Sequence, residues 1–107
     1  MKNSPIDLNN TFLTRELDIC GKNDATEAIV TISIGKPSKD SDDSWSCPYV
    51  ISGLSEIESS TYRVKGIDSV QALINAFKVI EGSLSGTNIA KQGLLRWCGE
   101  SNLPFLR

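Results

Sequence analysis

The first two thirds of the chain alternate hydrophobic and polar positions, which is the pattern of half-buried β-strands. The pattern is clearest in Glu27–Ile34, E-A-I-V-T-I-S-I, where β-branched residues are enriched. Three other segments show shorter forms of it and are predicted as strands: Thr11–Ile19, Trp45–Leu54 and Thr61–Lys65. Because proline has no N–H to donate, we expect the strand around Pro48 to lie at a sheet edge or at a bulge.

Beyond these segments the hydrophobic period changes from two residues to that of an α-helix. Asp68 is a natural N-cap, and Gln71 follows three residues later as in a capping box. The pattern predicts an amphipathic helix from Ser69 to about Leu84. Its apolar stripe consists of Val70, Leu73, Phe77, Ile80 and Leu84.

Strands joined by polar turns and followed by one helix indicate an α+β domain. We expect an antiparallel sheet of four to five strands, with a fifth strand within Leu94–Gly99, and one long helix packed on one face. The first four stripe residues of the helix should pack on Ala28, Val30, Ile32, Tyr49 and Val64. The length of 107 residues suits a single domain over 1–107, with 1–10 as a loose lead-in.

Composition places the chain among ordinary folded domains. It is 39% hydrophobic and 22% charged, and no apolar run approaches the roughly 20 residues of a membrane helix. The N-terminus has one lysine and no apolar core of a secretory signal, so we expect a cytoplasmic protein.

The residue types exclude much of the usual catalytic chemistry. The chain has no histidine, which removes the Ser-His-Asp triad, the histidine base and histidine-ligated zinc. Its three cysteines form no C-x-x-C pair and are expected to be free thiols. The acidic run D-S-D-D-S fails the EF-hand pattern, because Trp45 and Ile51 stand where that loop needs glycine and glutamate. We therefore expect no enzyme activity, no cofactor and no metal.

Charge is distributed unevenly along the chain. Residues 1–39 have a net charge of zero, residues 40–58 a net charge of −5, and residues 59–107 a net charge of +3. Such a block either only keeps the protein in solution or forms a face for a basic partner, such as an RNA- or DNA-cleaving toxin. The second alternative predicts a toxin-binding surface in which an exposed tryptophan is the anchor. Its residues would be Asp40, Asp42, Asp43, Trp45, Glu56 and Glu58.

The aromatic residues allow a different interpretation, a platform on which nucleic-acid bases stack. Such a platform also needs clustered cations for the phosphates, and here only Arg63 and Lys65, with Arg96, form a basic stripe. The aromatic residues concerned are Trp45, Tyr49, Tyr62 and Trp97.

Three stretches resemble a known group of small bacterial proteins. They are W-S-C-P-Y-V-I-S-G-L at Trp45–Leu54, Y-R-V-K-G-I-D-S-V-Q-A-L at Tyr62–Leu73, and L-L-R-W ending at Trp97. Proteins with these W-x-C-P-Y and G-[IV]-D-S stretches look like immunity proteins of contact-dependent growth inhibition systems. The resemblance implies a non-enzymatic protein that neutralises a cognate toxin domain by binding it. The β-β-β-β-α order is also similar to half of a Whirly-type single-stranded-DNA-binding domain, which implies nucleic-acid binding as the alternative function.

Overall fold

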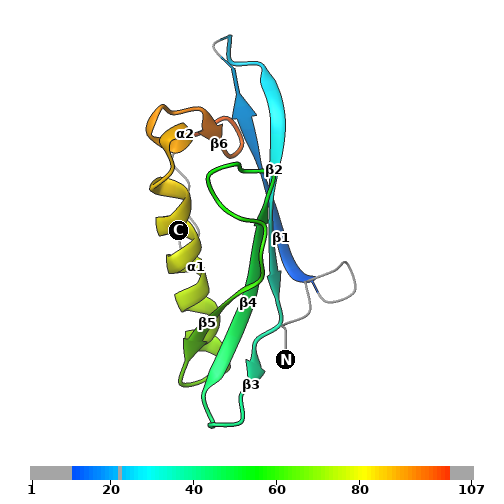
Figure 1. Cartoon of the computed structure of the whole chain (residues 1–107), viewed down its shortest axis with the longest axis vertical. Helices are drawn as coiled ribbons and strands as arrows, with labels where there is room; N and C mark the ends of the chain where they lie inside the picture. Colours follow the sequence, from blue (N-terminus) through cyan, green and yellow to red (C-terminus); the bar gives the residue numbers. More distant parts are fainter. Residues whose placement is uncertain (1–10, 22, 102–107) are drawn as a thin grey trace.

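The computed structural model describes residues 11–21 and 23–101, so the lead-in expected at 1–10 lies outside the described residues. An antiparallel sheet with one main helix on one face confirms the α+β fold (Figure 1). The elements in chain order are β1 (Thr11–Cys20), β2 (Thr26–Gly35), β3 (Ser38–Lys39), β4 (Trp45–Ser52), β5 (Tyr62–Gly66), α1 (Ser69–Ser85), α2 (Asn88–Lys91) and β6 (Leu95–Arg96).

β4 runs through the centre of the sheet. One side of it pairs with β2 over residues 49–52 and with β3 over residues 45–46. The other side of β4 pairs with β5. Trp45, for example, pairs with Lys39 of β3 on one side and with Gly66 of β5 on the other. β2 pairs in turn with β1, which makes a two-residue pairing with β6 at Asp18 and Ile19. This order places the β3–β4 hairpin at one end of the molecule and α2 at the other (Figure 1).

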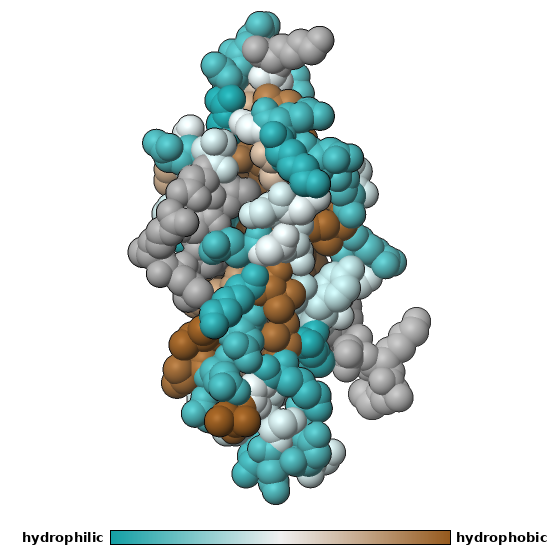
Figure 2. Space-filling view, turned by 90° about the vertical axis from the view of Figure 1, so that its left-hand side faces the viewer, coloured by the Kyte–Doolittle hydropathy of each residue, from teal (hydrophilic) through white to brown (hydrophobic). Residues whose placement is uncertain are grey.

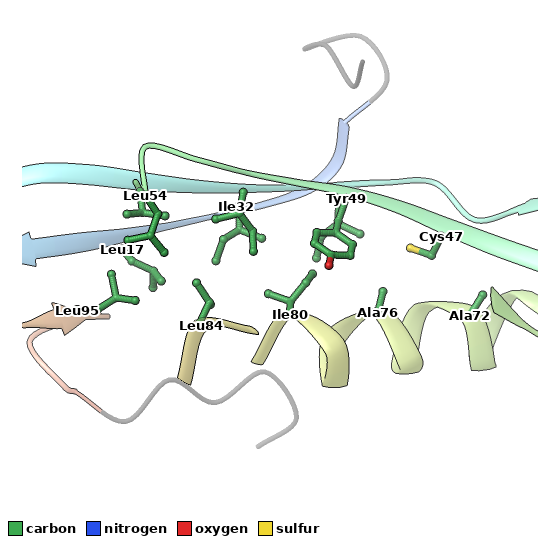
Figure 3. Packing of buried hydrophobic residues seen from close by; sticks show 13 residues of the cluster. Leu17, Ile32, Cys47, Tyr49, Leu54, Ala72, Ala76, Ile80, Leu84 and Leu95 are labelled. Carbon is green, nitrogen blue, oxygen red and sulfur yellow. The ribbon is translucent and has the colours of Figure 1, made fainter. Parts of the chain in front are cut away.

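The core lies between the sheet and α1. In β2, Val30, Ile32 and Ile34 are buried while Ile29 on the opposite face is 45% exposed, as strand alternation requires. Figure 3 shows Cys47 and Tyr49 of β4 directed toward the helix. The helix buries Ala72, Ala76, Ile80 and Leu84 against these strands.

The predicted packing face of α1 is partly wrong. Val70 is 64% exposed, and Leu73 and Phe77 are only partly buried. The reason is that α1 packs mainly over β4 and β5 through its small residue Ala72, whose backbone lies against β5. Ala28 is exposed, because it lies far along β2 from the part of the sheet that α1 covers.

The start of α1 is confirmed. The Asp68 carboxylate accepts a hydrogen bond from the Gln71 amide at 2.7 Å, which satisfies one of the free N–H groups of the first turn. The Gln71 side-chain oxygen in turn accepts from the Ile67 amide at 2.8 Å, one residue earlier than in a standard capping box. This turn therefore fixes where Ile67 lies.

Pro48, expected at a sheet edge or at a bulge, does not lie at an outer edge of the sheet. Pro48 is buried in the central strand and is the partner of Arg63 in β5. On its other side the pairing of β4 changes from β2, which reaches Tyr49, to β3, which reaches Ser46. The missing N–H is tolerated because the neighbouring strand is interrupted beside Pro48.

The end of the described chain forms only part of the predicted final strand, because Trp97–Glu100 closes a tight turn. Cys98 and Gly99 both have positive φ in this turn, 52° and 81°. The guanidinium carbon of Arg15 lies 4.0 Å from the centre of the Trp97 ring, a cation–π contact that joins the turn to β1. Among the described residues no helix has both the length and the apolar character needed to cross a membrane.

Candidate functional site

The β3–β4 hairpin contains the three aspartates of the acidic run. The Asp40 amide donates to the Ser44 carbonyl at 2.7 Å, and the Asp43 amide donates to the Asp40 carbonyl at 3.1 Å. The Asp42 carboxylate accepts from both the amide and the hydroxyl of Ser44. Asp43 has a φ of 68°, a left-handed conformation that aspartate tolerates better than most residues. The acidic run is therefore also the sequence that makes this turn possible.

Two lysines lie beside these carboxylates. The Lys65 ammonium is 3.3 Å from Asp42 and 3.8 Å from Asp40, and Lys39 is 3.6 Å from Asp43. The pairs are exposed, so solvent screens them and they neutralise the hairpin only in part. The hydrogen bonds from Ser44, with a smaller effect of Lys65, lower the pKa of Asp42 to about 2. Asp42 is therefore ionised at neutral pH.

An exposed apolar group lies at the same end of the molecule. Ile67 is 78% exposed, the largest exposed fraction among the large hydrophobic residues described, and Val70 follows it at the start of α1. The pairing of Trp45 with Gly66 brings this turn alongside the hairpin. Figure 2 shows hydrophobic side chains among hydrophilic ones on the α1 side, toward this end.

We name this region the tip surface. Its four carboxylates and the two neighbouring lysines leave a net charge of −2 at the same end of the molecule as the exposed apolar side chains. The tip surface consists of Asp40, Asp42, Asp43, Ile67, Asp68 and Val70.

The predicted anchor Trp45 is not the exposed group. It is half-buried and packs against the core, because strand alternation places it on the face of Cys47 and Tyr49. Ile67 occupies the exposed position instead, and the sequence analysis did not include it. An apolar residue directly before a helix N-cap commonly packs on the first turn of the helix, so the local sequence offered no signal that Ile67 is exposed.

Glu56 and Glu58 do not join the aspartates. Glu56 accepts hydrogen bonds from the Asn88 and Ile89 amides, at 2.8 and 3.2 Å, and thereby caps α2. α2 follows the C-terminal end of α1 whereas the tip surface adjoins its N-terminal end, and the 17 residues of α1 separate the two by roughly 25 Å. Glu56 is therefore separated from the three hairpin aspartates, so the five carboxylates do not form one continuous acidic face. Figure 1 shows the β3–β4 hairpin and α2 toward opposite ends of the molecule.

The residues of the nucleic-acid alternative are also separated. Tyr62 stacks on Tyr49 on the helix side of the sheet, with ring centres 5.3 Å apart. Arg63 and Lys65 alternate with Tyr62 and therefore face the opposite side. Lys65 is in addition paired with hairpin aspartates.

The buried thiol of Cys47 offers little reactivity. Burial raises the pKa of the Cys47 thiol to about 11, and its sulfur lies 3.5 Å from the Gly35 carbonyl oxygen. Such a thiol is a poor nucleophile because it is protonated at neutral pH. No set of three or more potential metal ligands forms within residues 11–21 and 23–101. A cavity of about 450 Å³ near the β1–β2 turn includes Cys20 and Glu27 in its lining.

Comparison with known families places the chain. A family model described as a domain of unknown function, DUF6968, matches residues 13–107. The chain belongs to the DUF6968 family. No curated protein and no solved structure matches the chain.

The DUF6968 match covers the sheet, α1 and the whole tip surface. The tip surface is thus part of the family domain and not an appendage to it. The family description assigns no activity. A function for the protein therefore has to be argued from the chemistry of its own tip surface.

Proposed function

We propose that the protein is a non-enzymatic immunity protein that acts in the bacterial cytoplasm and binds a basic toxin domain. Support comes from the tip surface together with the resemblance of Trp45–Leu54 and Tyr62–Leu73 to immunity proteins of contact-dependent growth inhibition systems. The toxin in this proposal is a nuclease, because an enzyme that binds phosphate chains has a cationic surface.

The observation that carries the proposal is the juxtaposition of exposed carboxylates with an exposed apolar group. Asp42 and Asp43 lie on the hairpin while Ile67 and Val70 lie on the adjoining turn and helix. Carboxylates speed the encounter with a cationic partner, whereas affinity comes largely from apolar side chains buried at the centre of an interface. The tip surface has both kinds of group at one end of the molecule.

The mechanism we propose is stoichiometric occlusion. The carboxylates of the tip surface would take the place of substrate phosphates on the toxin, and Ile67 would be buried against it. Inhibition then requires one protein per toxin and no turnover.

The geometry separates the β4 and β5 aromatic residues of the nucleic-acid alternative from Arg63, one of its predicted cations. Tyr49, Tyr62 and Trp45 lie on the helix side of the sheet, away from Arg63 on the open side. A stacking platform needs aromatic rings and cations on the same surface.

The test is binding to a candidate toxin domain, to be sought in the gene directly upstream of the one that encodes this protein. Surface plasmon resonance should show a complex whose association rate falls with salt, and the toxin should lose its nuclease activity at a one-to-one ratio. The double substitution Asp42→Lys and Asp43→Lys should slow association several-fold, whereas Glu58→Lys, on the loop after β4, should change it little. Absence of binding by the wild-type protein, or tight binding of labelled single-stranded DNA in a fluorescence anisotropy titration, would overturn the proposal.

A further inference from the structure

The exposed apolar side chains of the tip surface continue along one flank of α1. Ile67, Val70 and Ile74 are spaced three and four residues apart, and Ile74 is still 37% exposed. At about 100° of rotation per residue, Val70 and Ile74 lie on the same flank of α1. Ile67 precedes the N-cap Asp68, and its amide donates to the Gln71 side chain in the first turn of the helix. We name Ile67, Val70 and Ile74 the α1 stripe.

The α1 stripe does not belong to the core. α1 packs on the sheet through the face that carries Ala72, Ala76 and Ile80, and Val70 lies on the flank of that face. Large apolar side chains that lie together in water do not contribute to the stability of a monomer. Exposed apolar patches of this kind commonly mark interaction sites.

The charges near the α1 stripe indicate which kind of partner can bind there. Asp68 and the hairpin carboxylates Asp42 and Asp43 lie at the same end of the molecule as the start of the stripe, and they repel the anionic surface of a lipid bilayer. An isologous contact with a second copy would bring two net negative tip surfaces together. A cationic segment with its own apolar stripe meets neither objection.

The shape of the α1 stripe favours a helical segment of the partner over an extended one. Val70 and Ile74, one turn apart on α1, form a ridge of the kind that packs alongside the grooves of another helix, at roughly 8–10 Å between axes. Strand addition would instead need a free sheet edge, which the α1 stripe does not offer.

We infer that the α1 stripe docks an amphipathic, lysine- or arginine-rich helix of the partner, with the basic end of that helix against the carboxylates of the tip surface. This inference rests on the proposed function and names the part of the toxin that is recognised. Three side chains are far less than the roughly 800 Å² per partner of a stable interface, so the isolated helix binds weakly, with a Kd on the order of 100 µM.

The probe is a synthetic peptide of about 14 residues, with leucines at helical spacing and lysines at the polar positions. A matched peptide has glutamate in place of every lysine. Titration into the ¹⁵N-labelled full chain should shift the amide signals of residues 66–75 and of the β3–β4 hairpin with the lysine peptide only.

The variant Ile67→Ser with Val70→Ser should weaken binding of the lysine peptide at least about tenfold. Val79→Ser is the matched control, because Val79 is 42% exposed but lies about two and a half turns beyond Val70, on the other flank of α1. Since all three side chains are exposed, thermal unfolding should confirm that the variants fold like the wild type.

Equal shifts with both peptides, shifts centred away from α1, or equal losses in the control variant would overturn the inference. Concentration-dependent shifts of residues 66–75 without peptide would show a second copy as the occupant and would also overturn it. A toxin that binds the wild type and the Ile67→Ser, Val70→Ser variant equally well refutes the inference and leaves the proposed function standing. Peptide binding to the α1 stripe without any toxin binding refutes the proposed function and leaves a cationic helix as the occupant of the α1 stripe.

Discussion

Gly66 holds the tip surface in place, and replacing it with alanine should test the packing of α1 on β5. Gly66 is the last residue of β5, one residue before Ile67. A Cβ at this position would lie 2.4 Å from the Ala72 nitrogen and 2.8 Å from the Ala72 Cα. Because these are backbone atoms of the helix, no side-chain rotation relieves the overlap, and α1 must move.

The cost follows from that geometry. Overpacking a tight contact destabilises by about 1–3 kcal/mol, and a backbone obstacle favours the upper end of that range. At roughly 4–8 °C per kcal/mol for a domain of this size, Gly66→Ala should lower the Tm by roughly 12–24 °C.

Gly82→Ala is the matched control within the same helix. A Cβ at Gly82 meets nothing within 4 Å, so the substitution should raise stability by roughly 0.5–1 kcal/mol through the helix propensity of alanine. Circular dichroism melts at 222 nm and urea titrations measure both variants. If the Tm of the Gly66→Ala variant lies within about 2 °C of the wild-type Tm, the close approach of α1 to β5 is refuted.

Three further outcomes are expected. Glu56→Ala should remove the hydrogen bonds to the Asn88 and Ile89 amides, leave Thr87 as the N-cap of α2, and lower the stability by roughly 1 kcal/mol, with faster amide exchange in α2. Glu58→Ala should leave both unchanged. Carbon NMR of the carboxyl group should give a pKa near 2 for Asp42. The ionised carboxylate therefore stabilises the fold above the ordinary pKa of 3.8, and this stabilisation is lost as the pH falls toward 2. Ser44→Ala should raise the pKa of Asp42, and an unchanged pKa would contradict the assignment of its shift to the Ser44 hydrogen bonds. Ellman's reagent should modify one thiol per native chain rapidly, that of the exposed Cys98, and all three thiols in denaturant.

Local patterns predicted most of the fold. The alternation in Glu27–Ile34 and the change of period after Lys65 depend only on neighbouring residues, and the structure has β2 and α1 at these places. The N-cap at Asp68 could be predicted for the same reason, since a cap involves residues no more than three apart.

The candidate site could be predicted only in part. The hairpin aspartates lie together because they are adjacent in sequence, but Glu56 faces amides 32 and 33 residues away in α2. Trp45 follows its strand into the core, and Ile67 meets the hairpin only through the pairing of β4 with β5. Long-range pairings of this kind leave no periodic trace in the sequence.

By itself, the sequence determined where the four longer strands and the long helix lie, where α1 begins, and that the chain has no histidine for catalysis. It did not predict β3 or α2. Only the tertiary structure decided which flank of α1 is buried, because that depends on how closely Ala72 approaches Gly66 across two elements. The same packing leaves Val70 and Ile67 in solvent beside the aspartates. Hydrophobic period tells which residues can be buried, and the fit between surfaces decides which of them are.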